Sequence, residues 1–190
     1  MTVIAIDADA MQRALEGRTI VGYEATEMAL WEQGPGGLPV FSHPEVPCVQ
    51  CLSLMILFED GTELRIQTNP YDVEWGLIIV GDVPPNERNL EIERDEQSIY
   101  RSAALGRFPV GVITRVTVTP AGSGKGQVRA LVLELGERAV TLVAGEFEEQ
   151  FDGSVRLLLD DDSILFFPSG DGLDWAEAQV ARGPIRPATT

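Results

Sequence analysis

The stretch Leu52-Ser53-Leu54-Met55-Ile56-Leu57-Phe58-Glu59-Asp60-Gly61-Thr62 decides the fold class of this chain. Its first seven residues are almost continuously apolar, which is typical of a strand that is covered on both faces. The Asp60-Gly61 pair is a strong hairpin signal, and a second strand-like run follows at residues 64–68. We therefore predict an antiparallel hairpin over residues 52–68 in a β-rich protein.

Three further pairs of apolar and β-branched runs predict hairpins later in the chain. They lie at residues 75–80 with 90–92, 128–135 with 139–143, and 155–159 with 164–167. The last pair is joined by Asp160-Asp161-Asp162-Ser163, a composition typical of a turn.

Three segments carry helix signals. Residues 7–15 begin at a candidate N-cap, Asp7, and end before Gly17. Residues 95–105 repeat this design, with Asp95 as the cap and Gly106 as the stop. A closing helix is predicted at residues 173–182.

The order of these elements indicates an internal duplication. Residues 17–22 align without a gap on residues 106–111, and each half contains a short helix, a strand and two hairpins. We predict an α+β, β-rich fold of two similar halves, 1–94 and 95–182, whose antiparallel sheets are related by a pseudo-twofold, and a flexible tail at 183–190. The alternative is a chance similarity between two small α+β modules.

The charge of the chain excludes some classes of partner. The 190 residues include 30 acidic and 14 basic side chains, a formal charge of −16, and residues 1–100 alone hold 18 acidic and 5 basic ones, or −13. A phosphate backbone would be repelled, so nucleic-acid binding is disfavoured. The sequence contains neither a long apolar run nor a secretory n-region, so we expect a cytoplasmic protein with no membrane partner.

No motif in the sequence specifies a reaction. The chain has a single histidine, His43, and no G-x-S-x-G elbow. The Gly-rich segment 122–126 lacks the first glycine and the Ser/Thr of a phosphate loop. Residues 160–162 lack the spacing of a calcium loop and are predicted to be a solvated turn. We therefore predict that the protein is not an enzyme and has no cofactor and no catalytic residues.

The segment His43-Pro44-Glu45-Val46-Pro47-Cys48-Val49-Gln50-Cys51 resembles the H-x-E and P-C-x-x-C signature of the zinc-dependent nucleobase deaminases. The resemblance implies that His43, Cys48 and Cys51 are zinc ligands and that Glu45 is a proton shuttle. A single residue separates the two halves of the signature, however, and Cys51 leads into a strand rather than a helix. We predict no metal site and unligated thiols, with a three-ligand zinc clip as the alternative.

Aromatic residues framed by carboxylates predict a partner-binding surface. The segment Asn69-Pro70-Tyr71-Asp72-Val73-Glu74-Trp75 has this character, and so do residues 28–32 around Trp31. Aromatic anchors within one sign of charge suit a basic protein partner. We predict Tyr71, Asp72, Glu74 and Trp75 as binding residues. The alternative is that the tryptophans belong to the core.

The size, acidity and missing catalytic motifs of this chain are similar in profile to those of bacterial immunity proteins. That resemblance implies a stoichiometric inhibitor, a protein-binding module that occludes a basic toxin domain. Two alternatives stay open. One is a small-molecule or metal-binding protein, or an enzyme, with its site at the cleft between the halves. The other is a structural subunit of a larger assembly.

Overall fold

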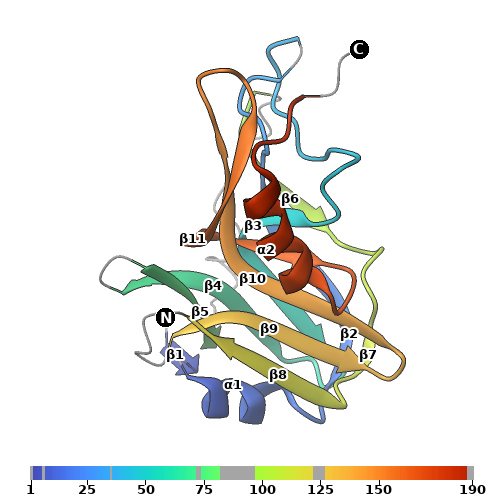
Figure 1. Cartoon of the computed structure of the whole chain (residues 1–190). Helices are drawn as coiled ribbons and strands as arrows, with labels where there is room; N and C mark the ends of the chain where they lie inside the picture. Colours follow the sequence, from blue (N-terminus) through green and yellow to red (C-terminus); the bar gives the residue numbers. More distant parts are fainter. Residues whose placement is uncertain are drawn as a thin grey trace.

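The computed structural model describes residues 2–5, 7–34, 36–71, 74–81, 97–121 and 127–187. Within these ranges the chain forms two helices and eleven strands, and all eleven strands belong to one connected antiparallel sheet system (Figure 1). The helices are α1 (Ala8–Leu15) and α2 (Gly172–Arg182). The strands are β1 (Thr2–Ala5), β2 (Thr19–Met28), β3 (Val49–Phe58), β4 (Glu63–Tyr71), β5 (Glu74–Gly81), β6 (Tyr100–Ala104), β7 (Gly111–Val112), β8 (Arg115–Pro120), β9 (Val128–Leu135), β10 (Arg138–Glu149) and β11 (Val155–Phe167).

Six strands close into an antiparallel barrel in the order β5, β4, β3, β11, β10, β9. The ring is completed where Leu77 of β5 pairs with Val128 of β9. Outside the ring, β1 pairs with β5 and β8 pairs with β9. Strand β2 pairs with β3 and also with β6 and β7. The predicted β-rich, antiparallel α+β class is confirmed.

The strongest local signals are confirmed. The Asp60-Gly61 turn joins β3 to β4, with Gly61 at φ 77°, a backbone angle that glycine adopts at little cost. The pair β9–β10 forms at the predicted residues. Asp7 caps α1, since its carboxylate accepts a hydrogen bond of 2.9 Å from Ala10 N. The predicted closing helix is α2.

The helix predicted at residues 95–105 is wrong in its described part, because residues 100–104 form strand β6. This strand pairs along the edge of β2, from Met28↔Tyr100 to Glu24↔Ala104. The side chain of Arg101 also forms an ion pair with Glu27 on β2. The open hydrogen-bonding edge of β2 outweighs the modest helix propensity of this segment.

The hairpin predicted at residues 155–167 is also wrong, because these residues form one strand, β11. Both of its ends pair with the long strand β10, and the register shifts between Ala144 and Gly145, where residues 160–163 are inserted. The aspartate-rich segment is therefore a bulge that bends a strand and does not reverse the chain.

The structure does not show the predicted pseudo-twofold. Residues 17–22 lead into the ten-residue strand β2, whereas residues 106–111 lead into the two-residue strand β7. Residues 90–92 and Asp95 lie outside the described ranges. In the segment predicted as a tail, Ile185 is buried and pairs with Val155.

Parts of β3, β10 and β11 are buried on two sides, as their continuous apolar runs predict. One core fills the barrel and includes Ile164 and Phe166; the other lies outside it, beneath α2, and includes Leu165 and Phe167. Beyond the register shift, residues 145–159 leave the barrel as a two-stranded projection, which we call the arm. Figure 1 shows the arm and α1 at opposite ends of the molecule.

Candidate functional site

The bend in β11 is fixed by contacts with two other strands and by a hydrogen bond within the bend itself. Asp160 adopts a left-handed backbone with φ 57° and forms a two-point ion pair with Arg129 of β9. The hydroxyl of Thr68 on β4 donates to the carbonyl of Asp162. Asp162 N donates to Asp161 Oδ1 at 2.8 Å. The segment predicted as a solvated turn is therefore half-buried and held in one conformation.

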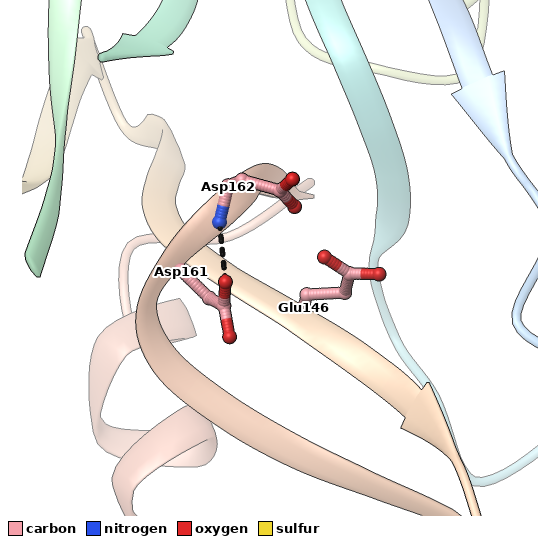
Figure 2. Close-up of side chains that lie close together, drawn as sticks. All are labelled: Glu146, Asp161 and Asp162. Atoms are coloured by element: carbon pink, nitrogen blue, oxygen red, sulfur yellow. Dashed lines mark hydrogen bonds between the residues drawn. The ribbon is translucent and has the colours of Figure 1, made fainter. Parts of the chain in front are cut away.

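This bend brings three carboxyl groups together, which we call the carboxyl cluster. Figure 2 shows Asp161 and Asp162 on the bend of β11 and Glu146 on the neighbouring strand β10. One oxygen from each residue lies within 4.8 Å of the others. Carboxylate oxygens are the ligands that Ca²⁺ and Mg²⁺ prefer, and they also bind ammonium and guanidinium groups. The chemistry of the cluster is therefore that of a cation receptor.

The charged groups that shift the pKa values at the cluster are all carboxylates. Burial raises the pKa of Glu146 to about 8, helped by a hydrogen bond with Asp162 and by the negative charges of Asp162, Asp161 and Glu148. The pKa of the Tyr100 phenol is also raised, first by burial and then by Glu146, Asp162 and Glu32. The negative potential at Tyr100 thus includes contributions from the cluster and from Glu32.

A groove of about 810 Å³ continues from Glu146 along the arm, and we call it the acidic groove. Four of its lining residues are glutamates and none is basic. Its lining residues are Met28, Ala29, Leu30, Glu32, Gln33, Glu146, Phe147, Glu148, Glu149, Gln150, Phe151 and Gly153.

Hydrogen bonds fix the two walls of the groove relative to each other. Trp31 Nε1 donates to the carbonyl of Gly153 at 2.9 Å, and Glu32 N donates to Glu149 Oε2 at 3.0 Å. On the arm, the register places Arg156 opposite Glu148. Glu148 therefore has a basic cross-strand neighbour. The cross-strand neighbour of Glu146 is Leu158, and that of Glu149 is Val155, and both are apolar.

The turn at the end of the arm exposes an aromatic ring. Phe151 is wholly exposed. The turn beneath it is closed by Gln150 N donating to the Ser154 carbonyl at 2.7 Å and by Gly153 N donating to the Gln150 carbonyl at 2.9 Å. A large apolar side chain on a well-bonded turn is a common feature of binding anchors.

The binding residues predicted from the sequence lie on the β4–β5 hairpin. Tyr71 ends β4 and pairs with Glu74 at the start of β5, whereas Asp72 lies outside the described residues. Trp75 is half-buried. Trp75 is not among the described residues that line the acidic groove, and the role of the four residues in binding stays a prediction.

The second aromatic and acidic segment, residues 28–32, does line the groove. Trp31 is buried at 1% exposure, so it belongs to the core and its indole supports the arm, while Glu32 lines the groove. The sequence analysis did not identify Glu146, Asp161, Asp162 or Phe151. The run of aspartates at residues 160–162 is the sequence signal for the carboxyl cluster, although the same composition is typical of a turn.

The residues of the deaminase-like segment do not converge. Cys48 lies in the outer core and Cys51, within β3, in the inner core, and burial raises the pKa of both thiols. His43 Nδ1 accepts a hydrogen bond from Glu45 N at 3.2 Å. Among the residues that the structure describes, only the carboxyl cluster brings three potential metal ligands together.

Comparison with known proteins assigns no family. No family model, no curated protein and no solved structure matches this chain. In the described ranges, neither helix has the length and apolar character needed to cross a membrane.

Proposed function

We propose that this protein is a binding module for a basic protein partner and that the acidic groove is its contact surface. The observation that carries the proposal is the composition of the groove, in which Glu32, Glu146, Glu148 and Glu149 occur without a basic lining residue. Burial is the main cause of the raised pKa of Glu146, and the negative charges of Asp162, Asp161 and Glu148 add to it; a cationic side chain entering the groove would offset those charges.

The shape of the site favours a polypeptide over a single metal ion. A groove of about 810 Å³ is far larger than an ion needs, and it is lined by apolar side chains such as Met28 and Leu30 as well as by carboxylates. An extended basic segment can place its charged ends on the glutamates and its aliphatic stems on the apolar residues. Binding of Ca²⁺ to the carboxyl cluster is the competing outcome that the experiment below tests.

The partner class that we propose is a basic bacterial toxin domain, which this protein would occlude as an immunity protein. The support comes from the size and acidity of the chain, with its formal charge of −16. A field of that sign would speed the encounter with a basic partner and make association dependent on salt. Tyr71, Asp72, Glu74 and Trp75 remain proposed as additional contacts.

The experiment measures binding of a fluorescein-labelled hexa-arginine peptide by anisotropy at low and high salt. Replacing Glu32, Glu148 and Glu149 together by Gln should weaken binding roughly tenfold or more, because charge-assisted contacts are lost. The matched control replaces the exposed residues Glu59, Glu137 and Asp174 by their amides. It changes the net charge equally but leaves the groove intact, so it should weaken binding much less.

Two results would overturn the proposal. The first is equal weakening by the groove variant and by the control, which would mean that the peptide responds only to net charge. The second is tight binding of Ca²⁺ that Glu146→Gln abolishes, together with no binding of the peptide. That result would identify the site as a cation site.

A further inference from the structure

Two arginines of this protein make the same pair of contacts, one with a phenylalanine ring and one with a carboxylate. The first example is Arg18, whose guanidinium carbon lies 3.4 Å from the centroid of the Phe58 ring. One terminal nitrogen of the same guanidinium lies 3.4 Å from Asp60 Oδ1. The flat face of the cation thus meets the ring while its edge meets the carboxylate.

The second example is Arg101. Its guanidinium carbon lies 4.1 Å from the centroid of the Phe41 ring, and its Nε donates to Glu27 Oε2. The two examples come from different parts of the fold. In the first, the ring and the carboxylate are two residues apart on the β3–β4 hairpin, whereas in the second, Phe41 and Glu27 lie on different segments. The combination suits arginine in particular, because a guanidinium can stack and donate in its plane at the same time.

Phe151 shows the same combination without an arginine. Its ring is wholly exposed, and it lines the acidic groove together with Glu148 and Glu149. In the described part of the chain, guanidinium groups lie over Phe58, Phe41 and Phe108, and none lies over Phe151.

The exposed ring is presented on a fixed support. Besides the hydrogen bonds within the turn, Asp152 Oδ1 accepts from Ser154 N at 3.0 Å. The base of the turn is bonded to the Trp31 indole on one wall, and Val155 forms two hydrogen bonds of 2.8 Å with Ile185. A side chain held in this way loses little backbone freedom when a partner binds.

We propose that Phe151, with Glu148 and Glu149, forms a site for an arginine side chain of the partner and makes the acidic groove selective for arginine over lysine. This inference rests on the proposed function and names the side chain that the groove selects. A lysine ammonium also forms ion pairs with the glutamates, but it cannot stack a planar face on the ring.

Two basic side chains flank the arm. Arg156 lies opposite Glu148 in the register, and the charge of Arg186 contributes to lowering the pKa of Asp152. Neither arginine is among the described residues that line the groove. Glu149 pairs with the apolar Val155, and its Oε2 accepts the hydrogen bond from Glu32 N, so Oε1 is the oxygen that we expect to receive a partner's guanidinium.

The test compares hexa-arginine with hexa-lysine on the wild type, Phe151→Leu and Phe151→Trp. The wild type should bind hexa-arginine about two- to fivefold more tightly than Phe151→Leu does, which is the strength of an exposed cation–π contact. Leucine keeps most of the apolar area but has no π face. Because an ammonium group interacts with a ring but cannot stack on it, the affinity for hexa-lysine should fall less than the affinity for hexa-arginine. Phe151→Trp should restore or increase the preference for arginine.

The outcomes separate this inference from the proposed function. If Phe151→Leu binds both peptides as the wild type does, while the Glu32, Glu148 and Glu149 variant weakens both, the arginine site is wrong and the groove stands. If neither substitution changes binding of either peptide, the groove itself is wrong. Equal loss of both peptides in Phe151→Leu would show that the ring acts only as apolar area.

Discussion

The guanidinium of Arg129 and the carboxylate of Asp160 form a two-point ion pair, with Nε 2.8 Å from Oδ1 and a terminal nitrogen 2.5 Å from Oδ2. Asp160 is also the one non-glycine residue with positive φ in the described ranges. The pair therefore holds the backbone of β11 in the unusual conformation that creates the bend, and the bend creates the carboxyl cluster.

Breaking this pair should destabilise the protein. Asp160→Asn keeps a side chain that tolerates the left-handed backbone but removes the charge. We expect a loss of about 1–3 kcal/mol in the free energy of unfolding, measured by urea denaturation, because a half-buried arginine loses its two-point charged acceptor and retains the longer pair with Glu177 at 3.9 Å. The control is Arg115→Gln, which breaks the exposed pair with Glu134 and should cost less than about 1 kcal/mol. Equal losses in the two variants would contradict the role given to the bend.

Glu146 should make stability fall as the pH rises. Its folded pKa is about 8 and its ordinary value is 4.5, so between these values the folded state binds the proton more strongly than the unfolded state does. Stability from this group is therefore fully present below its ordinary pKa and is lost as the pH rises through the folded pKa. We compare the unfolding midpoints of Glu146→Gln and the wild type. Between about pH 5 and about pH 8 the wild type should lose stability relative to the variant, because glutamine does not titrate. A gap that does not change with pH would refute the shift.

The two thiols should be unreactive in the folded protein. Burial raises the pKa of Cys48 and Cys51, so neither forms the thiolate that attacks a disulfide reagent at neutral pH. Titration with Ellman's reagent should detect free thiols only after denaturant is added. Fast reaction of the native protein, or protection that a zinc chelator removes, would support the metal alternative instead.

Gly172 should not tolerate a side chain. A Cβ at this position would lie 2.5 Å from Cγ of Phe167, whose ring is packed beneath α2. Gly172→Ala should therefore cost about 1–3 kcal/mol, through displacement of the helix from β11. Gly106→Ala is the control, since nothing lies within 4 Å of its Cβ position and its φ is not strained, and thermal unfolding should show little change there. Similar melting temperatures for the two variants would contradict this packing.

Local signals in the sequence predicted the parts of the fold that depend on local chemistry. Asp7 predicted the start of α1, and Asp60-Gly61 predicted the β3–β4 turn, because a capping carboxylate and a left-handed glycine act within three or four residues. The two wrong elements, at residues 95–105 and 155–167, depend on distant partners. β6 needs the edge of β2, and β11 needs the length of β10.

The candidate site also depends on contacts between residues that are far apart in the sequence. Glu146 meets Asp161 and Asp162 only because four residues are inserted opposite the step from Ala144 to Gly145. Whether Asp160-Asp161-Asp162 is a turn or a bend depends on Arg129, thirty-one positions away, and no spacing rule contains that information. The acidic character of residues 28–32 was visible in the sequence, but the arm opposite them was not.

The contact between Trp31 and Gly153 joins positions 122 residues apart, and the Ile185 pair at Val155 comes later still. One wall of the groove therefore leaves the ribosome long before the other. A nascent chain that has emerged only as far as Glu32 contains one wall of the groove, and the groove cannot form until residues 146–153 of the arm have followed. The proposed contact surface therefore exists only after both segments have been synthesised and paired.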